Sequence, residues 1–350
     1  MTNSPALKGI NTLTILAPGL FGPPGLRAAD FANLNCVAVE TLLARAVAED
    51  IPAKGLEATL FHLFDVERDP AQDLPVAAVT RAADVGERSD AFWLRADPVH
   101  LRADQAHLIL FDSQTLKITQ AEADSLVTEF NALFSPDGWH LEAPHPERWY
   151  LRLPEDPHIR TYDLREALGR SIDGFLPSGA RGRRWHTVLN EVQMLFHASP
   201  VNQARIARGG APINSVWFWG GGQAPRNIPA RWSHVWSDEP VATGLSHLAG
   251  TSHSAIPASA NQWLEHNPAP GAHLMVLDAA YGAALYGDVS AWGEAMERLV
   301  DNWFSPLLDA LKRRDICALD ILPADGRKYR ITPSSLRRFW KRRRSLEIYL

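Results

Sequence analysis

Cysteine and long hydrophobic runs are both scarce in this chain. Only two of its 350 residues are cysteines, Cys36 and Cys317, and they lie far apart, so neither a disulfide framework nor a paired-cysteine metal site is available. No stretch reaches the roughly 18 apolar residues of a membrane-spanning helix, and residues 1–9 lack the apolar run of a signal peptide. We therefore expect a protein of the reducing cytoplasm without membrane association.

A strong net charge of one sign is also missing. The formal net charge is -5, which gives the surface as a whole no electrostatic reason to bind nucleic acid or an acidic membrane. One short segment differs, since it interleaves six cations with Phe339 and Trp340: Arg337, Arg338, Lys341, Arg342, Arg343 and Arg344. Without these six charges the rest of the chain carries -11. Nucleic acid is therefore a conceivable partner only through this basic C-terminal tail, residues 337–350.

Hydrophobic residues make up 46% of the sequence, which is enough for a sizeable core. Short apolar runs alternate with segments of helical spacing. We predict strands at 11–17, 215–219, 273–278 and 316–322, and helices at 35–48, 187–196, 241–248 and 291–311. Such alternation favours a mostly parallel sheet flanked by helices. The predicted fold class is therefore α/β.

Proline-bearing stretches at 70–75 and 144–157 bracket a section of different character. This section reads as strands at 91–94 and 107–111 joined by a polar link at 97–104, followed by a helix at 120–133. We therefore predict a smaller inserted α+β subdomain over residues 91–160. It would separate a first part of the α/β core, residues 1–90, from the remainder, residues 161–336, which the basic tail follows.

The most patterned stretch lies between His197 and Gly222. It contains Ser199-Pro200-Val201-Asn202, then Arg205, Gly209, Pro212 and Asn214, and ends in Trp217-Phe218-Trp219-Gly220-Gly221-Gly222. Glycines at a strand end let backbone amides approach a ligand closely, but the Lys-Ser or Lys-Thr of a nucleotide-binding loop is missing. A tight turn and core packing of the tryptophans are the alternatives. The candidate ligand-binding residues are Asn202, Arg205, Asn214, Gly220, Gly221 and Gly222.

This stretch resembles a pattern of archaeal-type cofactor-independent phosphoglycerate mutases, members of the alkaline phosphatase superfamily. His62-Leu63 through Asp69-Pro70 is similar to a second segment of that family, and residues 97–104 resemble bacterial regulatory proteins of the RpfE type. The resemblance implies an alkaline-phosphatase-like fold over most of the chain. It also suggests that the chain is a degenerate relative of these enzymes.

The resemblance further implies a serine nucleophile and two divalent metals, yet the matching positions carry other residues. The metal-binding aspartate after the first strand falls on Pro18, and the nucleophile falls on Ala58. An Asp-x-x-x-His ligand pair falls on Tyr281 and Leu285, and the histidine of a last Asp-His pair falls on Gly326. We therefore predict no catalytic residue, no metal and no cofactor.

Three hypotheses about function remain after these comparisons of positions. The leading one is a non-catalytic regulatory protein, or pseudoenzyme, that binds a small anionic ligand or a protein partner. The second is an active metal-dependent phosphoglycerate mutase or phosphatase that uses the substitutes Thr59, Asp278 and Asp325. The third is a nucleic-acid-associated protein acting through residues 337–344. A zinc protease and a serine hydrolase are disfavoured, because HExxH and G-x-S-x-G patterns are missing.

Overall fold

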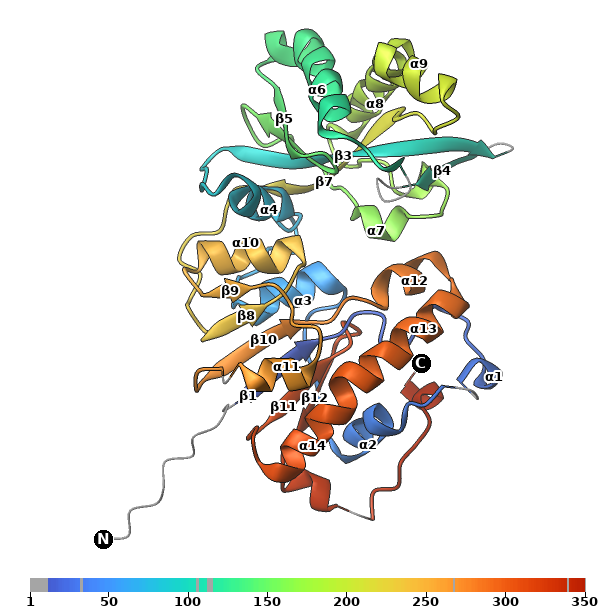
Figure 1. The fold of residues 1–350 in the computed structure, drawn as a ribbon. Coiled ribbons are helices and arrows are strands. Elements are labelled where there is room, and N and C mark those ends of the chain that lie inside the picture. The colour runs from blue at the N-terminus through green and yellow to red at the C-terminus, as the bar shows by residue number, and fades with distance from the viewer. Residues whose placement is uncertain are drawn as a thin grey trace. The chain divides into compact units, whose positions relative to one another are not determined.

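The computed structural model describes residues 12–31, 34–104, 107–111, 116–266, 268–338 and 340–349. The chain divides into two compact units (Figure 1). Unit 1 comprises Met1–Val66 and Ile228–Leu350, and unit 2 comprises Glu67–Asn227. The subdomain that we predicted at 91–160 falls inside unit 2, whose bounds are wider at both ends. Phe339 of the basic tail lies outside the described residues.

Unit 1 is built on a seven-stranded sheet with the order β2-β12-β11-β1-β10-β8-β9. Five consecutive strands of this sheet run parallel to one another: β1 (Thr12–Leu16), β8 (His234–Trp236), β9 (His253–Ser254), β10 (Ala272–Val276) and β11 (Leu319–Leu322). β12 (Arg327–Ile331) pairs antiparallel with β11 and with the edge strand β2 (Val47–Asp50). β1 is central because its apolar residues are buried on both sides of the sheet. The mostly parallel sheet predicted from the sequence is confirmed.

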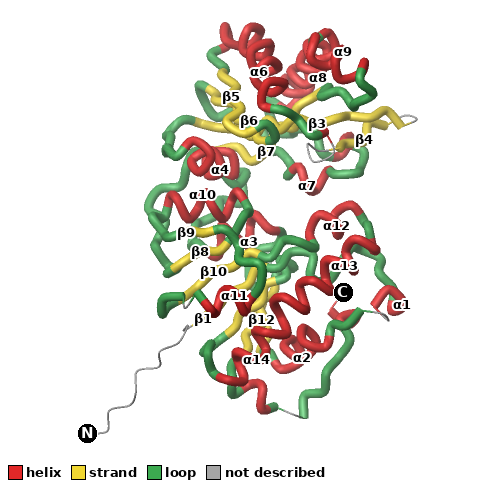
Figure 2. The backbone as a smooth tube through the Cα atoms, in the orientation of Figure 1, coloured by secondary structure: helices red, strands yellow, loops and turns green. Residues whose placement is uncertain are grey.

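Helices surround this sheet, as the backbone tube of Figure 2 shows. The N-terminal half contributes α1 (Ala28–Phe31), α2 (Val37–Arg45) and α3 (Leu56–Leu63); the C-terminal half contributes α10 (Pro240–Leu248), α11 (Ala260–Glu265), α12 (Tyr281–Tyr286), α13 (Val289–Leu299) and α14 (Ser305–Arg313). α13 and α14 join through a π-helical stretch, η3 (Val300–Phe304), so the long helix predicted at 291–311 is confirmed. Leu13 and Ile15 of β1 share one core with Trp292 and Phe304.

Unit 2 is built on a five-stranded antiparallel sheet. Its longest strand, β3 (Phe92–Asp104), pairs with β4 (His107–Phe111), β6 (Arg148–Leu153) and β7 (Ser215–Gly222), and β5 (His140–His145) pairs with β6. The helices of this unit are α4 (Val76–Val85), α6 (Gln120–Phe134), α7 (Leu164–Ala167), α8 (Gly182–Ala198) and α9 (Pro200–Ala207). α6 and α8 share an aromatic core with the sheet, whereas α4 contacts β3 and β7.

Two predictions about this region are wrong. The polar link expected at 97–104 is the second half of β3, because Asp97 is buried against Arg95 and does not interrupt the strand. The strand expected at 215–219 continues through Gly222, and it pairs antiparallel with β3 rather than lying in the parallel sheet. In the described part of the chain no helix is both long and apolar enough to span a bilayer.

Candidate functional site

The carboxyl edge of the parallel sheet in unit 1 gathers the positions where chemistry was expected. Pro18 and Gly19 follow β1, and a Cβ placed on Gly19 would lie 3.0 Å from the Cα of Tyr281. The loop after β11 meets the start of α3, since the backbone N–H of Gly55 donates to the carbonyl of Ala324 over 2.8 Å. In parallel α/β sheets this edge is the usual ligand-binding edge.

The side chains at four of the expected catalytic positions are poor metal ligands or nucleophiles. Pro18 is buried and has no oxygen donor, and Ala58 in α3 is half-buried and has no attacking atom. Tyr281 and Leu285 lie in α12, where the resemblance would require a carboxylate and an imidazole. Among the described residues, no group of three or more His, Cys, Asp or Glu side chains could hold a metal ion.

A lysine lies where the resemblance would place the last histidine. A Cβ placed on Gly326 would come within 2.9 Å of the Cε of Lys54, so the lysine side chain passes over this glycine. Beside it, burial raises the pKa of the Asp325 carboxyl, while its hydrogen bond from the backbone N–H of Arg327, 2.9 Å long, acts in the opposite direction. At the carboxyl edge of this sheet, the Lys54 side chain therefore occupies the space that a histidine ligand at position 326 would need.

The substitutes considered for an active enzyme differ in their surroundings. The Thr59 hydroxyl is fully buried and donates to the Gly55 carbonyl one helical turn earlier, over 2.6 Å. Such a back-bonded hydroxyl points along its own helix and not toward a substrate. Asp278 follows β10 and is exposed, and its carbonyl accepts a hydrogen bond from the Tyr281 N–H over 2.8 Å.

The predicted ligand-binding residues all lie in unit 2, and Asn202 is the most buried of their side chains. Its amide nitrogen donates to the carbonyls of Phe196 and Ile213, each over 2.8 Å, and its oxygen accepts from the Ile213 N–H over 2.7 Å. Only 1% of its surface is exposed, so the Asn202 side chain serves as the hydrogen-bonding partner of backbone groups between α8 and β7.

Asn214 and Arg205 are likewise bonded to the protein. Asn214 exchanges two hydrogen bonds with the backbone of Leu101, 2.7 and 2.8 Å long, which extends the pairing of β3 with β7. Arg205, 3% exposed, donates to the carbonyls of Ala211 and Leu116 and to the carboxylate of Glu122. Burial alone would raise the pKa of Glu122, but hydrogen bonds from Thr119, Arg208 and Arg205 lower it to about 2.

Gly220, Gly221 and Gly222 let neighbouring elements approach β7 closely. Gly220 has φ +64°, and a Cβ there would lie 2.9 Å from the Cβ of Val76. A Cβ on Gly222 would lie 2.7 Å from the Cβ of Pro75. These contacts seat α4 on the sheet, which is a packing role for glycine.

Two of the six predicted residues also line cavities. Gly221 lines one of about 340 Å³, and Asn214 lines an open one of about 490 Å³. Ligand binding by the six residues stays a prediction, and the structure assigns a framework contact to each of their side chains or Cβ positions.

The basic segment is held to unit 1 at both of its ends. The guanidinium of Arg45 donates to the carbonyl of Leu336 over 2.9 Å before the segment. After it, Leu346 is fully buried, and the ring of Tyr349 stacks on Phe21 with the centroids 5.6 Å apart. Trp340 between these anchors is 67% exposed.

Comparisons of the sequence with known proteins give partial matches to one group of enzymes. No family model matches the chain. It is 26% identical over 189 residues to a probable 2,3-bisphosphoglycerate-independent phosphoglycerate mutase of Geobacter sulfurreducens, which covers 53% of this chain and 46% of that protein. It is 36% identical over 63 residues to the enzyme of Methanosarcina barkeri, or 18% of this chain and 16% of that protein. The matched regions thus span less than half of these relatives.

Comparisons of the structure agree with the predicted fold. The PH0037 protein from Pyrococcus horikoshii matches with a TM-score of 0.53 at 14% identity, over 93% of this chain and 87% of that one. A cofactor-independent phosphoglycerate mutase from Thermoplasma acidophilum gives a TM-score of 0.47 at 16% identity, over 92% and 90%. The sequence matches therefore show partial homology to cofactor-independent phosphoglycerate mutases, and the match to the PH0037 protein shows that the chain shares its α/β fold.

Proposed function

We propose that this protein is a non-catalytic regulatory or small-anion-binding protein on a phosphoglycerate-mutase-like scaffold. The observation that carries the proposal is the carboxyl edge of the sheet in unit 1, where Pro18, Ala58, Tyr281 and Leu285 stand at the expected catalytic positions. Phosphoryl transfer with two metals needs carboxylate or imidazole ligands and an activated nucleophile. These four side chains do not fit such a site, so we derive no catalytic step from it.

The same edge offers features that suit an anion. Lys54 lies over Gly326, and Arg327 follows immediately. A cation in place of a histidine ligand repels a divalent metal and attracts a carboxylate or a phosphate. A regulatory protein that senses a phosphorylated metabolite is thus compatible with both the scaffold and the altered side chains.

Two measurements on the purified full chain test the absence of catalysis. Elemental analysis should find no stoichiometric divalent metal, and a coupled assay with phosphoglycerate or a generic phosphomonoester, with added manganese, should find no turnover. Stoichiometric metal together with turnover would instead establish the alternative, an active mutase or phosphatase. That alternative must recruit residues such as Thr59, whose hydroxyl is bonded to its own helix.

Anion binding at the edge has its own test. Calorimetry with inorganic phosphate and with phosphoglycerate should detect binding that Lys54→Gln weakens by about tenfold, since charge-assisted contacts contribute about 1.5–3 kcal/mol. Lys312→Gln is the matched control, because Lys312 is an exposed lysine of unit 1 paired with Asp309. Equal affinities for the two variants would refute the edge as the anion site.

A second candidate function, nucleic-acid association through residues 337–344, is supported by the anchoring of this segment. Because both ends are held, its exposed cations are presented with less conformational freedom than on a free tail. Arg342→Gln with Arg344→Gln should lower the salt dependence of binding to a single-stranded oligonucleotide by about 0.7 per lost contact. Arg313→Gln, in α14, is the control, and an unchanged salt slope in the double variant would eliminate this candidate.

A further inference from the structure

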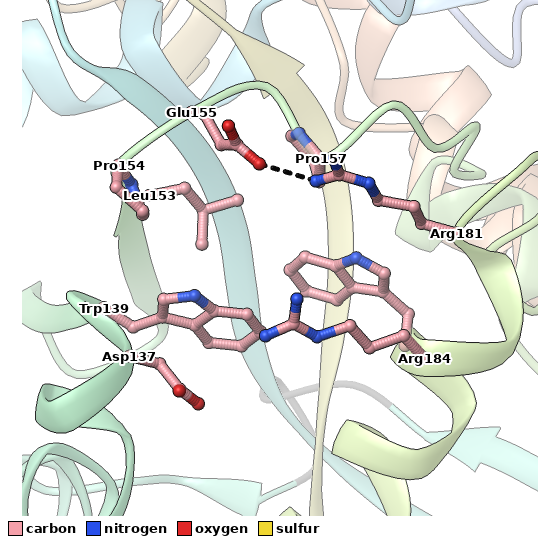
Figure 3. Close-up of a pocket in the computed structure, with 9 residues that line it drawn as sticks. Asp137, Trp139, Leu153, Pro154, Glu155, Pro157, Arg181 and Arg184 are labelled. Atoms are coloured by element: carbon pink, nitrogen blue, oxygen red, sulfur yellow. Dashed lines mark hydrogen bonds and ion pairs between the residues drawn. The ribbon is translucent and has the colours of Figure 1, made fainter.

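Unit 2 contains a cavity of about 280 Å³ that the sequence analysis did not anticipate. Three segments far apart in the sequence build it: residues 137–139 before β5, residues 153–157 at the end of β6, and residues 181–185 at the start of α8 (Figure 3). Its volume lies just below the range of about 300–1,000 Å³ for ligand pockets. A metabolite the size of an amino acid fits this volume better than a nucleotide.

The floor of this cavity is a rigid aromatic stack. The rings of Trp139 and Trp185 stack with centroids 5.0 Å apart and planes 16° from parallel. Phe134 continues the stack behind Trp139 at 5.5 Å, and Phe218 packs edge-on against Trp185 at 4.9 Å. Since both indoles are almost completely buried, the floor can hold a neighbouring side chain in one place.

Arg184 is the side chain held there. Its guanidinium carbon lies 5.9 Å from the centre of the Trp139 ring, within cation–π range. Among the described residues its side chain has no ion pair or hydrogen bond. The planar fork of N–H donors of Arg184 therefore lies at the cavity with its hydrogen-bonding capacity unused.

Two acidic residues balance the charge of the lining. Glu155 pairs with Arg181 over 2.6 Å, and this hydrogen bond lowers the pKa of Glu155, which is a carboxylate at neutral pH (Figure 3). Asp137 also lines the cavity, and within the described chain its carboxylate has no ion pair. Arg184 also attracts the Glu155 carboxylate electrostatically and helps to lower its pKa, but it forms no direct ion pair with it among the described residues. Its N–H donors and the Asp137 carboxylate lie beside an apolar wall formed by Leu153, Pro154 and Pro157.

We infer that this cavity binds a small zwitterion, namely an α-amino acid with an apolar side chain. The carboxylate of the ligand accepts hydrogen bonds from Arg184, its ammonium group lies toward Asp137, and its side chain contacts the apolar wall. A simple anion makes no contact with the Asp137 carboxylate, and a simple amine makes no use of the free N–H donors of Arg184. A zwitterion matches both charges.

Calorimetry on the full chain with three probes tests this inference. The probes are leucine, isocaproate, which lacks the amino group, and isoamylamine, which lacks the carboxylate. Leucine should bind at least about tenfold more tightly than either of the others, because each loses one charge-assisted contact. Equal affinity of leucine and isocaproate, or no binding of leucine at millimolar concentration, would overturn the inference.

Variants locate the binding. Arg184→Gln should weaken leucine binding by about tenfold or more, and Asp137→Asn should bring the affinities for leucine and isocaproate together. Arg183→Gln is the matched control, since Arg183 is exposed in the same helical turn but does not line the cavity. If Arg183→Gln and Arg184→Gln weaken binding equally, the site lies elsewhere. Circular dichroism of the variants should match that of the parent, because both arginines are exposed.

Discussion

The carboxyl edge of the sheet in unit 1 and the interior of unit 2 differ in their polar side chains: the edge lacks polar atoms at expected positions, whereas the interior contains a buried ion pair. At the edge, Pro18 and Ala58 have no polar atoms in their side chains where the resemblance calls for a ligand and a nucleophile. In unit 2, Arg95 and Asp97 are 6% and 1% exposed. The Arg95 guanidinium donates twice to one Asp97 oxygen, over 2.9 and 2.6 Å, and the indole of Trp219 donates to the other over 2.7 Å.

This difference has an energetic origin. A metal-binding side chain at a strand end faces the site and contributes little to the stability of the fold. Replacing it therefore removes metal binding and leaves the fold intact. Removing one partner of a buried ion pair leaves an uncompensated charge in a low dielectric. An α/β scaffold can therefore persist when a metal-binding side chain at a strand end is replaced, but it loses stability when one partner of a buried ion pair is removed.

The largest effect is expected where a buried charge loses its partner. Asp97→Ala should lower the free energy of unfolding of unit 2 by about 3–5 kcal/mol, because the buried Arg95 guanidinium loses the carboxylate to which it donates two hydrogen bonds. Chemical denaturation followed by tryptophan fluorescence measures this loss. Asp90→Ala is the control, since Asp90 forms exposed pairs with Arg88 and Arg226, and it should cost at most about 1 kcal/mol. Similar losses in both variants would contradict the contrast drawn above.

The same buried pair explains what the sequence could not predict about the fold. β1, β10 and β11 are apolar runs, so their burial in a parallel sheet follows from composition and spacing. The second half of β3 contains Asp97 and Arg102, which read as a loop, because pairing across the sheet is invisible in a linear pattern. Periodicity also gives no information on partners, so β7 was assigned to the wrong sheet.

The candidate sites also differ in how much of them the sequence could predict. The residues at the expected catalytic positions of unit 1 could be located from the sequence, because Pro18 follows the first strand and Ala58 lies at a fixed spacing before Asp69-Pro70. The cavity of Trp139 and Arg184 could not, because no local pattern connects residues 137–139 with residues 181–185. For Asn202 and Arg205 the residue types suggested a ligand, whereas burial gives each a set of protein partners.

The second prediction concerns Asn202, a residue interpreted from the sequence as facing a ligand. Asn202→Ala should destabilise unit 2 by about 2–3 kcal/mol, because the carbonyls of Phe196 and Ile213 and the N–H of Ile213 lose their partner. Gln203→Ala, its exposed neighbour, should change the free energy of unfolding by less than about 0.5 kcal/mol. If the Asn202 variant is as stable as the Gln203 variant, the framework role is wrong, and ligand titration becomes the appropriate assay.

The third prediction separates the backbone conformation of a glycine from its packing. Gly220→Ala should cost about 1–2 kcal/mol for its positive φ plus about 1–3 kcal/mol for the clash with Val76. Gly209→Ala has a similar φ, +78°, but no atom within 4 Å of the added Cβ, so it should show the first contribution alone. The difference between the two variants in thermal or chemical denaturation measures how closely α4 packs on β7. If both variants lose the same free energy of unfolding, α4 can shift away from the added methyl group without an energetic cost.

The smallest expected effect is a pH dependence centred on Glu122, which joins the first turn of α6 to Arg205 and Arg208. Its pKa is about 2 in the folded chain, below the ordinary value of 4.5, so the unfolded chain binds the proton first as the pH falls. The stabilisation by Glu122 is therefore complete above about pH 4.5 and is lost between that pH and about 2. Because the carboxylate is partly screened by solvent, we expect at most about 1 kcal/mol.

Denaturation of the parent and of Glu122→Gln at several pH values should give a stability difference that shrinks across this window, whereas Asp124→Asn, an exposed neighbour, should give none. A difference that stays constant down to pH 2 would show that the ion pair with Arg205 does not hold the two segments together.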